Sequence, residues 1–223
     1  MTTKPGLRIG LSGAVPEPEV LRDHGASSAD IHLTVRRLVE RALAQSDRIV
    51  YGSHPTFTPI IEEVASRRLR PDLDPRVMMF VAVRYFSPVD WEDYHQRHAH
   101  YAHVVPIGDF GTPVDDALHA LRDAMVAEFD AMICVGGKLH RDERNAKPGV
   151  LEEYERAVKR SPPIPIFLLG GFGGCTREIY EHRQPERVSN GLDAEEIRRL
   201  GETSQVWDAV ELVFKGLDKI RKA

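Results

Sequence analysis

Cysteine is scarce in this chain, with only Cys134 and Cys175 among 223 residues. No disulfide framework is therefore expected, and Cys134, inside the apolar run 131–135, is predicted to be a buried free thiol of a reducing compartment. No apolar run approaches the roughly 18 residues that a membrane span needs. Residues 1–6 also lack the apolar core of a secretory signal. We therefore expect a cytoplasmic protein with no membrane contact.

A basic excess and the short nucleotide-binding fingerprints are also missing. The chain has 30 Lys and Arg against 34 Asp and Glu, a formal charge of −4. Because a general nucleic-acid binder neutralises many phosphates, this balance disfavours that class, although it permits a local basic pocket for one small anion. No G-x-G-x-x-G follows the first apolar run and no G-x-x-x-x-G-K-[ST] occurs. Ordinary dinucleotide dehydrogenases and P-loop NTPases are disfavoured accordingly.

What the chain does contain is an alternation of short apolar runs with amphipathic stretches. This pattern is typical of buried parallel strands covered by helices, so it predicts an α/β, Rossmann-like three-layer sandwich with a mostly parallel central sheet. One domain is expected over residues 1–223. The segment 87–103 is the least regular, and we expect it to be an excursion over a pocket. Strands are predicted at 7–11, 47–51, 76–83, 104–105, 130–135 and 164–169, and helices at 33–44, 58–69, 114–128, 150–160 and 204–222.

Small residues follow four of the predicted strands, at Ser12-Gly13, Gly52-Ser53, Gly136-Gly137 and 170–174. Ligands of open α/β sheets bind beyond the carboxyl ends of the strands. Glycine there lets the backbone approach a phosphate, and the next helix N-terminus offers N–H donors. Tight turns need glycine in any case, but four such turns at one edge favour a ligand. We predict a nucleotide-type small molecule as the partner and no separate cofactor.

Several longer stretches resemble the SLOG superfamily, a Rossmann-like group that includes the Lonely Guy cytokinin-releasing hydrolases and the DNA-processing Smf proteins. The resemblance rests on residues 121–125, 130–137 and 149–154, and is extended by 51–55 and 170–174. Together they cover most of residues 7–175. The turn at 51–55 and the helix at 149–154 are most similar to SLOG domains of prokaryotic conflict systems. This resemblance implies a sensor of an ADP-ribose-type signalling nucleotide in antiviral defence, and a homo-oligomer.

The same resemblance implies an alternative, a nucleotide N-glycosidase that releases a free base. In the hydrolase pattern P-G-G-x-G-T-x-x-E, Gly136-Gly137 match the double glycine and Glu153 matches the glutamate. Residues 138–148 interrupt the pattern, Val150 replaces its threonine, and Leu121 stands at its upstream arginine with Arg122 adjacent. A carboxylate there can position water or stabilise a ribosyl cation, or it can accept ribose hydroxyl hydrogen bonds without chemistry. An assembly protein with a vestigial pocket is a third interpretation.

Charged side chains near these turns have two interpretations each. Arg122, Arg84 and Lys138 are candidate phosphate contacts, or else surface charges and salt-bridge partners. Glu153 is the candidate catalytic residue, whereas Glu152 is interpreted as a helix-start acid. The complete predicted ligand-binding set is Ser12, Gly13, Gly52, Ser53, His54, Arg84, Arg122, Gly136, Gly137, Lys138, Gly149, Glu153, Gly171, Gly173 and Gly174.

Two further clusters are given structural roles. The histidines at 95, 98, 100 and 103 have no neighbouring cysteine to complete a zinc motif, so we expect a polar surface segment and no metal. Trp207 and Phe214, seven residues apart on the last helix, are predicted to lie in the core or on a dimer face.

Overall fold

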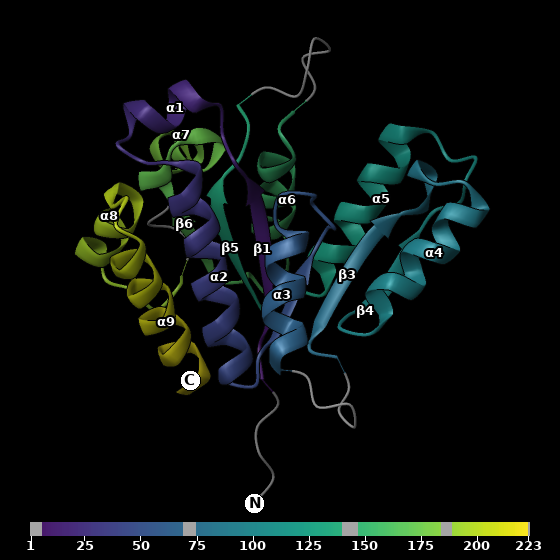
Figure 1. Ribbon diagram of the computed structural model, residues 1–223. Helices are drawn as coiled ribbons and strands as arrows, with labels where there is room; N and C mark the ends of the chain where they lie inside the picture. Colours follow the sequence, from purple (N-terminus) through teal and green to yellow (C-terminus); the bar gives the residue numbers. More distant parts are fainter. Residues whose placement is uncertain (1–5, 69–74, 140–146, 184–188, 223) are drawn as a thin grey trace, which may run out of the picture.

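The computed structural model describes residues 6–68, 75–139, 147–183 and 189–222. Its centre is a six-stranded, wholly parallel sheet with the order β4-β3-β2-β1-β5-β6 (Figure 1). This arrangement confirms the predicted Rossmann-like α/β sandwich. The strands are β1 Arg8–Ala14, β2 Arg48–Tyr51, β3 Val77–Ala82, β4 His103–Ile107, β5 Ala131–Gly136 and β6 Ile166–Leu169.

Helices cover both faces of the sheet. One hydrophobic core packs α2, α3 and α9 against side chains such as Ile133 of β5, and the other packs α5, α6 and α7 against the alternate side chains Met132 and Cys134. Because successive strand residues point to opposite faces, a strand buried on both faces must be apolar throughout. The helices are α1 Pro18–Asp23, α2 Ser28–Ala44, α3 Thr58–Arg68, α4 Pro88–Ala99, α5 Val114–Ala127, α6 Gly149–Val158, α7 Gly174–His182, α8 Ala194–Glu202 and α9 Val206–Lys222, with short 3₁₀ turns η1 Val83–Tyr85 and η3 Gly170–Phe172.

The expectation of an irregular segment at 87–103 was wrong, because α4 occupies most of it. The Ser87 hydroxyl accepts a hydrogen bond from the Asp90 backbone N–H, and Pro88 occupies the first turn. These are ordinary helix-start signals. Trp91 and Tyr94 pack against the first core, and His98 is buried at 6% exposure, so it is not part of a polar surface.

The other boundaries move by a few residues, and residue 69 of one predicted helix lies outside the described residues. At the C-terminal helix, Phe214 is fully buried but Trp207 is 59% exposed, with Arg37 4.8 Å from its ring centre.

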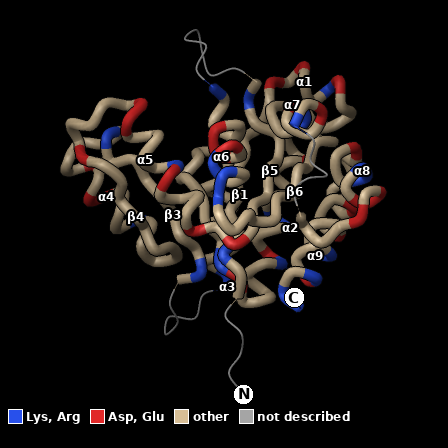
Figure 2. The backbone as a smooth tube through the Cα atoms, turned by 180° about the vertical axis from the view of Figure 1, so that it is seen from behind, with Lys and Arg blue, Asp and Glu red and all other residues tan. Residues whose placement is uncertain are grey.

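Seen from behind, Lys and Arg are interspersed with Asp and Glu over the helices (Figure 2). Within the described ranges, no helix is long and apolar enough to cross a membrane.

The order of the strands determines where a ligand site can form. The chain builds β1, β2, β3 and β4 outward on one side, then returns to the other side of β1 to form β5 and β6. The turns after β1 and β5 therefore diverge to different faces, which opens a crevice at the carboxyl edge of the sheet.

Candidate functional site

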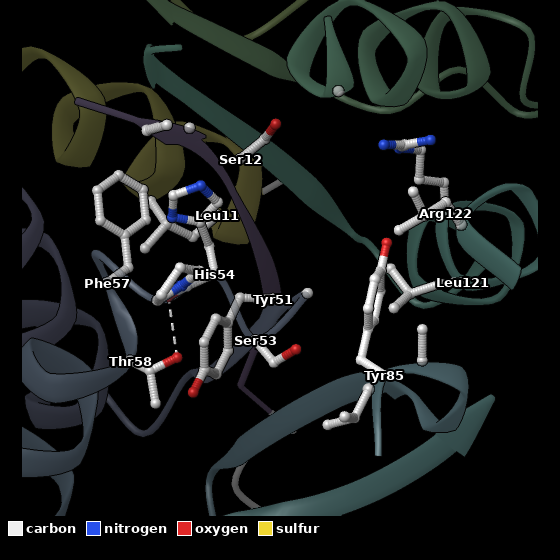
Figure 3. Close-up of a pocket in the computed structure, with 18 of the residues that line it drawn as sticks. Leu11, Ser12, Tyr51, Ser53, His54, Phe57, Thr58, Tyr85, Leu121 and Arg122 are labelled. Atoms are coloured by element: carbon white, nitrogen blue, oxygen red, sulfur yellow. Dashed lines mark hydrogen bonds between the residues drawn. The ribbon is translucent and has the colours of Figure 1, made fainter. Parts of the chain in front are cut away.

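A cavity of about 810 Å³ occupies this crevice, between the carboxyl ends of β1, β2 and β3 and the helices α3, α4, α5 and α6. Ser12 and Arg122 lie at one end of it, and Tyr51 and Thr58 at the other (Figure 3). Small-molecule sites usually measure about 300–1,000 Å³, so a nucleotide can be accommodated. Most of the predicted ligand-binding residues line it: Ser12, Gly13, Gly52, Ser53, His54, Arg122, Lys138, Gly149 and Glu153.

The carboxyl end of β1 brings a small side chain and a bare backbone to the cavity. Because β1 runs to Ala14, Ser12 and Gly13 lie within the strand and not, as the sequence had predicted, in a turn after it. Gly13 pairs with Val135 of β5, and a Cβ on Gly13 would lie 2.2 Å from the Val135 carbonyl oxygen. Only glycine permits this approach of the two strands. Ser12 is 2% exposed, and its Oγ has no hydrogen-bond partner among the residues described. A buried hydroxyl without a partner is costly, so Ser12 supplies a hydrogen-bonding group that a ligand can satisfy.

The turn after β2 carries a strained residue and a neutral imidazole. Ser53 has φ 49°, the left-handed region that non-glycine residues rarely adopt and that is enriched at functional sites. His54 Nδ1 accepts a hydrogen bond from the Thr56 N–H at 3.3 Å. Burial, with a smaller effect from the positive charge of Lys138, lowers the pKa of His54. The imidazole is therefore uncharged near pH 7, and the local positive charge comes from Lys138.

Arg122 is the centre of a buried ion cluster. It lies on α5 at 5% exposure, and its Nη1 donates to Glu152 Oε2 at 2.9 Å. Its Nε lies 3.9 Å from Glu153 Oε1. Glu152 also receives Arg156 Nη1 at 3.3 Å and has His119 Nε2 at 3.5 Å. Glu152 therefore fixes the guanidinium in place, a role that sequence reasoning missed by treating this residue as a helix-start acid.

Glu153 faces the cavity from the first turns of α6. Burial raises the pKa of its carboxyl group, while interaction with the Ser12 hydroxyl and the charge of Arg122 oppose the rise. Ser12 is thus close enough to influence Glu153, although the two do not form a hydrogen bond of normal geometry. A carboxyl group with a raised pKa holds a proton more readily than an exposed one, and its ionised form can accept hydroxyl hydrogen bonds.

The N-terminus of α6 opens onto the same end of the cavity. Pro148 is its N-cap and makes no side-chain cap hydrogen bond, so N–H groups of the first turn lack the usual side-chain acceptor. Pro148, Gly149 and Val150 all line the cavity. A Cβ on Gly149 would lie 3.3 Å from Arg122 Nη2, which places the guanidinium directly against this helix start. We call Ser12, Arg122, Lys138, Gly149 and Glu153 the polar end of the cavity.

The double glycine at the end of β5 supports the polar end of the cavity without lining it. Gly136 and Gly137 have φ of 61° and 91°, conformations that other residues rarely adopt. The Gly137 N–H donates to the Ala14 carbonyl at 2.7 Å, and the Gly137 carbonyl accepts from the Cys175 N–H at 3.0 Å. The double glycine therefore ties β1 to the start of α7 and releases the chain so that Lys138 reaches the cavity.

The other predicted residues are not among the described residues of the cavity wall. Arg84 is exposed on η1, and its Nη1 donates to the Phe110 carbonyl at 3.1 Å. The glycine turn after β6 packs inside the protein, where Cβ atoms on Gly171, Gly173 and Gly174 would meet the Thr203 carbonyl, the His24 ring and the Gly137 carbonyl. The turn therefore has a packing role, and its assignment to a ligand stays a prediction.

Sequence reasoning also missed one wall of the cavity. This wall comes from α3, η1 and α4, and it is aromatic and charged; its residues are Glu62, Tyr85, Phe86, Tyr94, Arg97 and His98. The available signal was the spacing of Trp91, Tyr94, His95 and His98, which repeats at helical intervals after the Ser87 cap.

Comparison with known protein families matches a segment that includes part of this site. No curated protein matches the chain. The family described as SLOG cluster2 matches residues 112–206. This segment carries α5 with Arg122, the double glycine at the end of β5, and α6 with Glu152 and Glu153. Over residues 112–206 the chain is therefore similar to the SLOG superfamily, which suggests a nucleotide-related function.

Proposed function

We propose that this protein binds a nucleotide in the cavity, with phosphate at the polar end. The observation that carries the proposal is the convergence of Arg122, Lys138 and the α6 N-terminus on a buried Ser12 hydroxyl that has no partner among the described residues. Guanidinium, ammonium and helix N–H groups are the donors that phosphate oxygens accept from. Glu153 lines the same end of the cavity, and its carboxylate would accept a hydrogen bond from a hydroxyl group of the ribose.

The proposed biological role of the protein is that of a nucleotide sensor. An ADP-ribose-type signalling nucleotide fits a cavity of about 810 Å³ with Arg122 and Lys138 at one end and the aromatic side chains of α4 at the other. A cytoplasmic homo-oligomer acting in prokaryotic antiviral defence is the corresponding proposal for this chain. A sensor requires binding without turnover, so binding and turnover must be measured separately.

A thermal-shift titration with AMP, NAD and ADP-ribose tests binding. At a hundredfold excess over Kd, a ligand that binds only the folded state should stabilise it by about 2.7 kcal/mol. Lys138→Met should weaken the binding of the nucleotide about tenfold, because a phosphate loses one charged contact. Lys159→Met is the matched control, since Lys159 is exposed at the far end of α6. The absence of a shift with any of these nucleotides contradicts the proposal.

One observation favours a second candidate, the N-glycosidase. Glu153 is a buried carboxyl group with a raised pKa beside Arg122, as a proton donor to a leaving base should be. Chromatography of the same nucleotides after incubation would show a free base if this candidate is right. Glu153→Gln should then abolish base release while leaving the thermal shift in place. Binding without release in the wild-type protein supports the sensor instead.

A further inference from the structure

The end of the cavity opposite the polar end has a different chemistry. We call it the α3–α4 compartment and define it by Glu62 of α3 and by Tyr94, Arg97 and His98 of α4. It lies beside Tyr51, since the charge of Glu62 contributes to the pKa of the Tyr51 hydroxyl, which burial raises to about 12. Figure 3 shows Tyr51 away from Ser12 and Arg122. The two ends are therefore separate places in one cavity.

Aromatic rings form a fixed wall at this compartment. The rings of Tyr94 and Phe86 have centres 4.7 Å apart, and those of Tyr94 and His98 are 4.3 Å apart. Tyr85 also lines the cavity, but it lies on the Arg122 side (Figure 3). The partly buried Tyr94 ring lines the compartment itself and is available to stack on a planar ligand.

Glu62 is the acidic group of this compartment, its side chain is 35% exposed, and no described residue hydrogen-bonds to its carboxylate. Among the described residues, His98 Nδ1 lies 3.9 Å from Glu62 Oε2, which is too far for a hydrogen bond. That nitrogen instead lies 2.9 Å from the Tyr101 hydroxyl. Burial lowers the pKa of His98, while Glu62 opposes this effect and Arg97 adds to it. An uncharged His98 does not neutralise Glu62, so the carboxylate is free to accept from a ligand.

We infer that the α3–α4 compartment holds the nucleobase and that Glu62 accepts a hydrogen bond from the exocyclic amino group of the base. This inference rests on the proposed nucleotide binding. The polar end brings Arg122, Lys138 and the α6 N-terminus together, so the phosphate belongs there. The amino N–H groups of bases are donors that Glu pairs with when it reads base edges, and a hydrogen bond to a charged acceptor is strong. Arg97 lines the same compartment and offers donors to ring nitrogens or carbonyl groups.

The consequence is selectivity for bases that carry an amino group. A site built around a hydrogen bond rejects an analogue that lacks the bonding group, because its own polar group is then left unpaired. Glu62 is therefore a specificity-determining residue. A base without the amino group should bind more weakly even though its phosphate and ribose are unchanged.

The test compares AMP with purine riboside 5′-monophosphate, which has hydrogen in place of the amino group. Calorimetry or fluorescence titration should show AMP binding about tenfold more tightly to the wild-type protein. Glu62→Gln should lower this preference to about threefold or less, because a neutral amide is a weaker acceptor than a carboxylate. Glu62→Gln keeps the side-chain volume, and its unliganded melting temperature shows whether the fold is intact.

Glu63→Gln is the matched control. Glu63 is the next residue of α3, and it pairs with Arg36 and Arg67 rather than lining the cavity. It should keep the wild-type preference. Equal binding of the two nucleotides by the wild-type protein overturns the inference but leaves the proposed function standing. An unchanged preference in Glu62→Gln also overturns it, and so does failure of both monophosphates to bind when NAD or ADP-ribose binds. Failure of AMP, NAD and ADP-ribose alike overturns the proposed function itself.

Discussion

Arg122 Nη1 donates to Glu152 Oε2 across 2.9 Å, between two side chains that are 7% and 10% exposed. Glu152 also receives Arg156 at 3.3 Å, so one carboxylate holds two guanidinium groups. Removing one partner of a buried pair leaves the other charge without compensation. The pair therefore contributes both to stability and to the position of Arg122 at the polar end of the cavity.

Glu152→Gln should lower the free energy of unfolding by about 3 kcal/mol, because Arg122 stays buried without its anionic partner. Urea denaturation measures the change. Glu155→Gln on the same helix is the control, since Glu155 pairs with Lys147, whose side chain is 60% exposed, and should cost at most about 1 kcal/mol. Equal losses in the two variants would show that Glu152 has no special role.

Gly13→Ala should destabilise the sheet by about 2–3 kcal/mol, as overpacking usually does. The added Cβ would lie 2.2 Å from the Val135 carbonyl oxygen, which is backbone and cannot rotate away. Thermal unfolding should show a clear drop in melting temperature. Gly111→Ala is the control, because a Cβ there would lie 3.4 Å from Asp109 Oδ1, an atom of a side chain that can move. A Gly13→Ala protein as stable as this control would contradict the strand geometry.

The Asp130 carboxylate should make the free energy of unfolding fall in acid. Burial alone would raise the pKa of Asp130, but hydrogen bonds and charge from Arg8 outweigh it and lower the pKa below 3.8. Arg8 reaches both carboxylate oxygens, at 3.1 and 2.9 Å. A lowered pKa stabilises the fold above the unfolded value of 3.8, and this stabilisation is lost as pH falls through the folded pKa.

Asp130→Asn should therefore cost about 1 kcal/mol at pH 7, a figure reduced by the partial solvent exposure of the pair. The cost should shrink toward pH 3. Denaturant titrations at several pH values measure it, with Asp123→Asn as an exposed ion-pair control. A cost that stays constant from pH 7 to pH 3 would refute the linkage.

His54 should respond to Lys138 in an NMR titration. Burial, followed by the charge of Lys138, lowers the pKa of His54, so Lys138→Met should raise it while leaving it below 6.5. Because the unfolded chain binds a proton more readily than buried His54, this group makes stability fall as pH drops below 6.5. An unchanged imidazole pKa in Lys138→Met would show that Lys138 does not act on His54.

Local sequence patterns predicted most elements of the fold. The apolar runs at 130–135 and 164–169 became β5 and β6, and the amphipathic stretch at 150–160 became α6, because strand burial and helix amphipathicity are periodic along the chain. The segment 87–103 was mispredicted because its many histidines obscured a Ser87 cap and an aromatic face. The Ser87 cap is a local signal that the sequence carries. The aromatic face of α4, in contrast, is buried only because the fold packs it against the first core.

The different roles of the neighbouring residues Glu152 and Glu153 could not be predicted from the sequence. Glu152 and Glu153 are both acidic residues near the start of α6, yet Glu152 turns to Arg122 and Arg156 while Glu153 turns to Ser12 and the cavity. No motif distinguishes them without the position of α5. The turn at 170–174 likewise resembled a phosphate turn, but its glycines are accounted for by close approach to Thr203, His24 and Gly137.

By itself, the sequence determined the α/β alternation, the small residues at the strand ends and the likeness to the SLOG superfamily, because each is written in neighbouring residues. The tertiary structure decided which strand ends share the cavity, since the return of the chain to β5 beside β1 sets that order. It also brought Glu62 and His98 to the end opposite Arg122. Contacts between segments so distant in sequence depend on packing, and no local pattern encodes them.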